Sequence, residues 1–139
     1  MLRMEKEHAD QMVAHSLQED PNECCGILTG NDDVVSKVHR ITNTAKSPFR
    51  YLMDPQEQLN VMLESERAGQ EILAFYHSHT HSPAYPSSTD VRMAQQSGWL
   101  GDDVFYVLVS LEDKDAPAIH AFHVQEDGEI VEEELEVTD

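Results

Sequence analysis

Two histidines, a serine and an aspartate lie close together in the sequence HSHTHSPAYPSSTD, which begins at His77 and ends at Asp90. His77 and His79 are separated by one residue. Alternate side chains of a β-strand point to the same face, so the two imidazoles can bind one metal ion, a role that neutral histidine performs well. A histidine pair in a strand is more often structural or solvated, so the pair alone does not establish a metal site.

Asp90 supplies what the histidine pair lacks. It follows His79 by 11 residues, beyond a loop with two prolines, and a carboxylate at this place can fold back as a third ligand. Three protein ligands leave one position for water. This is the arrangement of a catalytic zinc site, because the ion must lower the pKa of that water and polarise a substrate carbonyl. The spacing predicts a hydrolytic Zn²⁺ site made by His77, His79 and Asp90.

A hydrolase also needs a base, and Glu23 is the best candidate. It begins the apolar run ECCGILT, where a single carboxylate is out of place unless it has a task or a partner. Ser87 can donate its hydroxyl to a developing oxyanion. The S-x-x-D spacing of Ser87 and Asp90 is also that of a capping box at the start of a helix, and the two interpretations are compatible.

Other zinc arrangements are less consistent with the sequence. His81 continues the alternation of His77 and His79, and three histidines form a known catalytic zinc set. It belongs to the loop and not to the strand, so we expect it to line the substrate cleft or to lie in solvent. The sequence has neither the H-E-x-x-H of helical zinc proteases nor the H-x-E with C-x-x-C of nucleobase deaminases.

The surrounding sequence predicts a sheet with helices packed around it. Apolar residues at three- and four-residue spacings predict a helix over residues 5–17, which the breakers at 20–22 end. Strands are expected where β-branched, aromatic and aliphatic residues stand between turn residues. These runs cover residues 23–29, 34–41, 49–53, 72–79, 105–110, 119–124 and 130–137.

Two further helices are expected, and each begins at a capping residue. Asp54 as N-cap and Pro55 in the first turn begin a helix that ends near residue 69. Ser87 precedes a short helix over residues 88–97. The buried stripe of the first of these helices is predicted to consist of Leu59, Met62 and Leu63. The order of elements indicates an α/β or α+β fold with one sheet between helices.

Length and composition bound the class of protein. A chain of 139 residues suits one domain with one hydrophobic core, so we expect a single domain over residues 1–139. No run approaches the roughly 18 apolar residues of a membrane span, and the N-terminus lacks the apolar stretch of a secretory signal. We expect a cytoplasmic protein. Cys24 and Cys25, the only cysteines, would there stay reduced; Cys25 is expected in the core, and nothing in the sequence places Cys24.

The net charge of the chain limits the classes of partner that it can bind. Nine basic residues against 27 acidic residues give a net charge of -18, which repels nucleic acid and anionic lipid. We therefore expect neither a nucleic acid nor a membrane as partner. Eight of the last 14 residues are acidic, and a well-solvated surface accounts for most of this acidity.

The glutamate in the run ECCGILTG, then H-S-H, seven residues and S-x-x-D, resembles the JAMM (MPN-plus) metallopeptidases over nearly the whole chain. The resemblance implies a mixed sheet flanked by helices, similar to the cytidine deaminase fold. It implies that Zn²⁺ is bound by the two histidines and the aspartate, and that His81 is not a ligand. It also implies that Glu23 is the general base and that Ser87 stabilises the tetrahedral intermediate. The implied metal ligands are His77, His79 and Asp90.

A narrower resemblance concerns the substrate. The segments NTAKSPFRYLMDPQEQ and YHSHTHSPAYPSSTD are similar to bacterial members that free cysteine from the C-terminus of a ubiquitin-like sulfur-carrier protein. The family implies cleavage of an amide or isopeptide bond after a C-terminal Gly-Gly tail, which can dock as an added strand. The alternatives are removal of a protein tag, as by a deubiquitinase, and a non-catalytic module that binds a ubiquitin-like fold. Intact ligands argue against the module, and a homodimer stays open.

Overall fold

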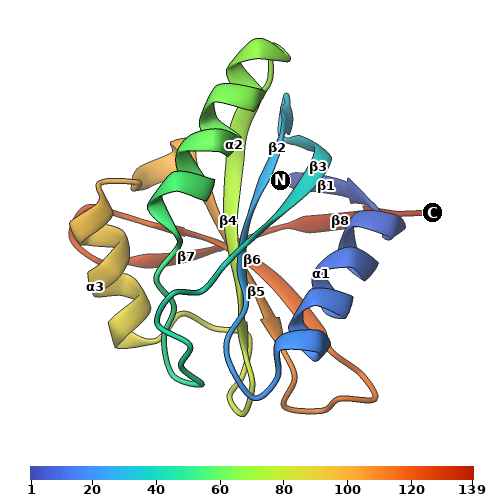
Figure 1. Ribbon diagram of the computed structural model, residues 1–139, viewed down its shortest axis with the longest axis vertical. Helices are drawn as coiled ribbons and strands as arrows, with labels where there is room; N and C mark the ends of the chain where they lie inside the picture. Colours follow the sequence, from blue (N-terminus) through green and yellow to red (C-terminus); the bar gives the residue numbers. More distant parts are fainter.

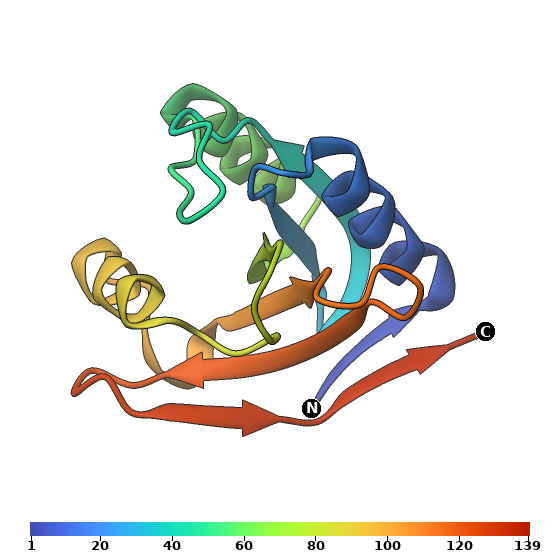
Figure 2. The same cartoon turned by 90° about the horizontal axis from the view of Figure 1, so that it is seen from below.

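The strands of this protein form one mixed sheet with the histidine-bearing strand near its middle. The computed structural model describes residues 1–139, and the eight strands run in the order β7-β6-β5-β4-β2-β3-β1-β8. Helix α1 covers one face of the curved sheet, and α2 and α3 lie over the other (Figures 1 and 2). The expected fold class is confirmed. In chain order the elements are β1 (Leu2–Glu5), α1 (Lys6–Glu19), β2 (Cys25–Asn31), β3 (Val34–Ile41), α2 (Pro55–Arg67), β4 (Glu71–His79), α3 (Ser88–Ser97), the 3-10 turn η1 (Gly101–Asp103), β5 (Phe105–Ser110), β6 (Ala118–Val124), β7 (Ile130–Glu133) and β8 (Leu135–Thr138).

Two apolar cores, one on each face, hold the helices to the sheet. Strand β4 pairs antiparallel with β2 and parallel with β5, and the register sets Cys25 opposite His77 and Ile27 opposite Phe75. Neighbouring side chains of a strand point to opposite faces. Cys25 and Phe75 therefore belong to the core under α2 and α3, whereas Cys24 and Tyr76 belong to the core under α1. The expected burial of Cys25 is confirmed, and Cys24 is buried as well.

The C-terminal segment runs along both edges of the sheet. β7 pairs with β6 at one edge and β8 pairs with β1 at the other, although only Glu134 separates β7 from β8. Figure 2 shows this C-terminal strap, residues 130–138, as a nearly continuous band. The Leu2 amide donates to the Glu134 carbonyl at 2.9 Å, which fixes the crossing point. The strap therefore draws the two edges of the sheet together.

Several expected elements differ from the structure. Residues 49–53 are not a strand: they belong to the β3–α2 loop, residues 42–54, whose backbone forms only one isolated bridge, between Asn43 and Met53. Strand β1 was not predicted because the alternation of its four residues is short and runs directly into a helix. None of the helices combines the length and apolarity needed to cross a membrane.

The start of α2 is as expected, but its buried face is not. Asp54 caps the helix by accepting hydrogen bonds at 3.0 Å from the amides of Gln56 and Glu57. The buried residues of α2 are Val61 and Ser65. The predicted stripe was wrong because the helix approaches the sheet through these smaller side chains. The three larger apolar residues are all exposed: Leu59, Met62 and Leu63.

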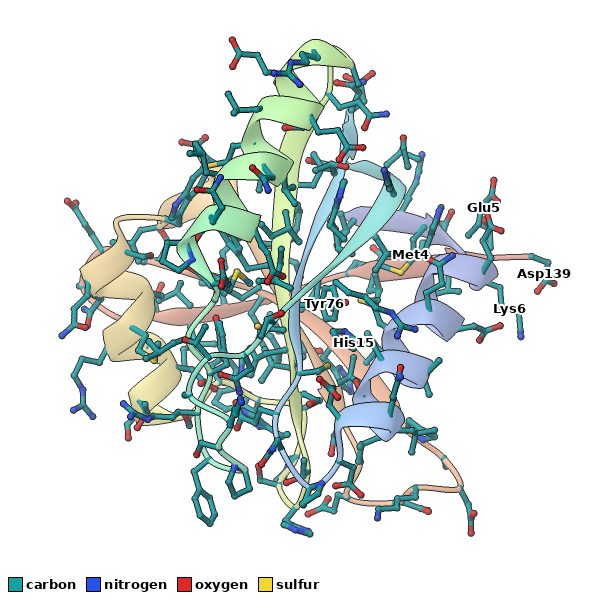
Figure 3. The ribbon with its side chains drawn as sticks, viewed as in Figure 1. Met4, Glu5, Lys6, His15, Tyr76 and Asp139 are labelled. Carbon is teal, nitrogen blue, oxygen red and sulfur yellow. The ribbon has the colours of Figure 1, made fainter.

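A polar pair is buried in the core between α1 and β4. His15 Nδ1 and the Tyr76 hydroxyl lie 2.8 Å apart and form a hydrogen bond (Figure 3). Gly26 makes room for the tyrosine, since a Cβ at that position would come within 2.1 Å of the ring. Burial, assisted by the charge of Arg40, lowers the pKa of His15 to about 4.

We expect the free energy of unfolding to fall as the pH is lowered from 6.5 toward about 4. In this window the unfolded chain binds a proton at His15, whereas the folded chain does not, so acid favours unfolding. Urea unfolding at a series of pH values measures the slope. His15→Gln should show a shallower slope than the wild type. Burial also lowers the pKa of His39, and Glu64 opposes this shift in part, but the contribution of His39 is common to both proteins. Equal slopes in the two proteins between pH 6.5 and 5 would contradict the assignment.

Candidate metal centre

Three buried ligand atoms converge at the end of β4. The Nε2 atoms of His77 and His79 lie 3.2 Å apart, and they lie 3.1 and 2.9 Å respectively from Asp90 Oδ2. Nitrogen and oxygen ligands about 2.0–2.1 Å from a tetrahedral ion are separated by about 3.3 Å, close to these spacings. The structure thus brings the three predicted ligands together in a group that can hold a metal ion.

Different elements position the three ligands. The histidines lie two residues apart on β4, so their side chains share one face of the sheet. Asp90 lies in the first turn of α3, in a capping box. Its Oδ2 accepts the Ser87 amide at 2.9 Å, and Ser87 Oγ accepts the Asp90 amide at 3.1 Å. The carboxylate oxygen that meets both histidines is therefore also held by the start of a helix.

The two imidazoles are oriented by different means. His79 Nδ1 donates to the Pro83 carbonyl at 2.9 Å, which leaves Nε2 free to act as a ligand. His77 has no such partner, because its Nδ1 is buried without a hydrogen bond. The Tyr51 ring lies against it instead, with ring centroids 4.6 Å apart and an interplanar angle of 31°. Packing against Tyr51 sets the orientation of His77.

Glu23 lies just before β2 and beside the ligand group. The Ser78 amide donates to the Cys24 carbonyl at 3.1 Å, which continues the β2–β4 pairing and sets Glu23 opposite His79. The Glu23 side chain is 4% exposed, and its Oε1 has no hydrogen-bond partner. Burial raises the pKa of Glu23 to about 7, against the opposing charges of His77 and His79. A carboxyl group with such a pKa suits proton transfer near neutrality.

The pKa of Asp90 is shifted in the opposite direction to that of Glu23. Burial on its own would raise the pKa of this carboxyl group. Interactions with His77 and His79 and the hydrogen bond from the Ser87 amide outweigh burial and hold the pKa of Asp90 well below its usual value. The pKa values of the two carboxyl groups of the site are therefore shifted in opposite directions, upward for Glu23 and downward for Asp90.

A polar cavity of about 250 Å³ opens beside the ligand group. His81 is exposed and lines this cavity, and it does not belong to the group of ligand atoms. Ser87 lines it too, so its hydroxyl is accessible from the side where Glu23 lies. The full lining consists of Glu23, Pro48, Phe49, His79, Thr80, His81, Ser82 and Ser87.

Sequence analysis missed the contribution of the β3–α2 loop. Asn43 is the hub of this loop: its Nδ2 donates to the carbonyls of Glu23 and Arg50, at 2.9 and 3.1 Å. Its Oδ1 accepts the amides of Ala45 and Leu52, each at 3.0 Å. The aromatic composition of residues 49–53 suggested a strand, whereas the nearby Asn, Ser and Pro residues were the signal for a loop.

Comparison with known proteins agrees with this geometry. The family described as prokaryotic homologs of the JAB domain matches residues 5–124. The chain belongs to this family. The resemblance to JAMM metallopeptidases seen in the sequence is thereby confirmed.

Two curated proteins and one solved structure illustrate the similarity of this JAB family member. The CysO-cysteine peptidase of Mycobacterium tuberculosis is 37% identical over 130 residues, covering 92% of this chain and 85% of that protein. The desampylase of Haloferax volcanii is 34% identical over 98 residues, covering 66% and 70% respectively. The solution structure of a Desulfitobacterium hafniense protein has a TM-score of 0.87 at 33% identity, covering 100% of this chain and 94% of that chain.

The contact between Tyr51 and His77 generates a prediction. Tyr51→Ala should weaken the binding of a divalent metal ion by about 10- to 100-fold, the usual effect of removing a group that orients a histidine ligand. Tyr51→Phe keeps the ring and should retain the wild-type affinity. Competition with a chromophoric chelator measures both.

Tyr85→Ala is the matched control, because Tyr85 is an exposed aromatic residue that packs on Phe122 and belongs to neither the ligand group nor the cavity lining. Wild-type affinity in Tyr51→Ala would show that His77 needs no packing partner. Weakened binding in Tyr51→Phe would assign the effect to the hydroxyl and not to the ring.

Proposed function

We propose that this JAB family chain is a zinc-dependent peptidase that cleaves the amide or isopeptide bond after the C-terminal Gly-Gly of a ubiquitin-like or sulfur-carrier protein. One observation carries the proposal: three convergent ligand atoms lie beside the buried, unpartnered carboxyl group of Glu23. A purely structural site has no use for a free carboxyl group at its edge. The names of the relatives, CysO-cysteine peptidase and desampylase, support the class of substrate.

The donor set suits zinc. Two imidazole nitrogens and one carboxylate oxygen are ligands that Zn²⁺ accepts, and three protein ligands leave a position for the catalytic water. We assign these positions to His77, His79 and Asp90. When bound, the ion would acidify a water and polarise the substrate carbonyl.

The remaining steps belong to Glu23 and Ser87. Glu23 accepts a proton from the attacking water and then passes it to the nitrogen of the leaving amine. Ser87 Oγ already accepts the Asp90 amide, so its own proton remains available for donation. It donates to the carbonyl oxygen as negative charge develops there.

Two substrates remain within this proposal. Similarity to the CysO-cysteine peptidase over most of both chains favours release of cysteine from a carrier protein during sulfur transfer. Similarity to the desampylase favours removal of a protein tag from a lysine as the second candidate. The assembled ligand group argues against a non-catalytic binding module. Two buried free cysteines fit a reducing compartment, so we place the protein in the cytoplasm.

Replacing the base tests the mechanism. Glu23→Gln should retain near-stoichiometric zinc by metal analysis but lose about 10²- to 10⁴-fold in cleavage rate, the usual contribution of a general base. The substrates are a sulfur-carrier protein ending in Gly-Gly-Cys and the same carrier joined to a lysine, and mass spectrometry follows the products. Glu112→Gln, an exposed glutamate outside the cavity, is the control. Wild-type turnover by Glu23→Gln would remove Glu23 from the mechanism, and the preferred wild-type substrate separates the two candidates.

A further inference from the structure

Two unpaired basic residues lie on the β3–α2 loop, which contributes Pro48 and Phe49 to the cavity lining. Four of the nine basic residues form ion pairs with carboxylates, and Arg40 bonds to Gln18. Of the four that remain unpaired, Lys46 and Arg50 flank Phe49, which lines the cavity. A chain with 27 acidic residues offers many partners, so two unpaired cations on one short loop call for an explanation. The other two unpaired residues are Arg67 and Arg92.

The loop that carries these cations is tied to Glu23. The Glu23 amide donates to the Ser47 carbonyl at 2.9 Å, and Asn43 Nδ2 joins the carbonyls of Glu23 and Arg50. The Lys46 amide donates to the Asn43 carbonyl at 3.2 Å. Lys46 and Arg50 therefore bracket the stretch of backbone that contacts the proposed base, and hydrogen bonds fix the backbone at both positions.

Another part of the cavity lining is polar. Thr80, His81 and Ser82 line it, and the Thr80 hydroxyl is buried without a hydrogen-bond partner. His81 is exposed and able to donate from its ring. Glu23 is the only acidic residue in the lining. The cavity lining is therefore poor in acidic residues and carries hydrogen-bond donors, and two exposed cations lie on the adjoining loop.

We infer that Lys46, Arg50 and His81 recognise the free α-carboxylate of a single-residue leaving group, so that the site releases the C-terminal residue of a carrier adduct. This inference rests on the proposed function. In a terminal residue the carboxylate carbon lies two bonds from the scissile nitrogen, and therefore beside Glu23. A lysine side chain in an isopeptide carries no carboxylate at that distance. Guanidinium and ammonium groups bind carboxylates through charge-assisted hydrogen bonds.

Two peptides test this recognition. Both carry the tail of a carrier protein and end in Gly-Gly-Cys, one with a free C-terminal carboxylate and the other with a C-terminal amide. The zinc-loaded wild type should cleave the acid with kcat/KM about tenfold or more above that for the amide, and salt should reduce the difference. The double variant Lys46→Met with Arg50→Met should bring the ratio close to one, and His81→Asn should reduce it in part.

Arg67→Met is the matched control, because Arg67 is unpaired too but lies in the last turn of α2. It should keep the wild-type ratio, and zinc content and thermal unfolding should be unchanged in all variants. Equal cleavage of acid and amide by the wild type, or an unchanged ratio in the double variant, would overturn the inference and leave the proposed peptidase standing. An equal loss of the ratio in Arg67→Met would overturn it too, in favour of net charge. Cleavage of neither peptide, with cleavage of the carrier joined to a lysine, would overturn the inference alone. Cleavage of none of the three substrates would refute the proposed function together with it.

Discussion

The antiparallel register of β2 and β4 is the constraint on which the rest of the site depends. It sets Cys25 opposite His77, and the next pair outward on the same face is Glu23 and His79. A slip of one residue would turn Glu23 toward α1 and away from the histidines. Apolar side chains prevent the slip, because both faces of these strands are buried in separate cores. The chemistry at the edge is thus held in place by packing in the middle.

Asp90 joins two functions in one carboxylate. The oxygen that caps α3 by accepting the Ser87 amide is also the one that contacts both histidines. Formation of the helix start therefore places the third ligand, and neither requirement can be changed without the other. This economy explains why the sequence signal S-x-x-D allowed two interpretations, a cap and a catalytic pair. The structure establishes the cap.

Local signals in the sequence predicted most elements of the fold and the positions of the candidate ligands. Alternation in β4 and capping at Asp54 and Ser87 depend on neighbouring residues, so they could be read directly. In the β3–α2 loop the Asn, Ser and Pro residues were a local signal, but the hydrogen bond from Asn43 to the backbone of distant Glu23 had none. The prediction of the buried face of α2 also failed, because the orientation of a helix on a sheet is decided by which side chains allow close approach.

In the C-terminal strap, acidic residues lie on the outer strands of the sheet. Strands at the edge of a sheet present unpaired backbone groups that invite pairing with another chain, and natural proteins blunt such edges with short strands and charges. The outer strands here, β7 and β8, have four residues each, and glutamates occur throughout the strap. The charges that composition alone attributed to solvation lie where intermolecular strand pairing would begin. Short outer strands that carry glutamates are the features by which sheets avoid pairing at their edges.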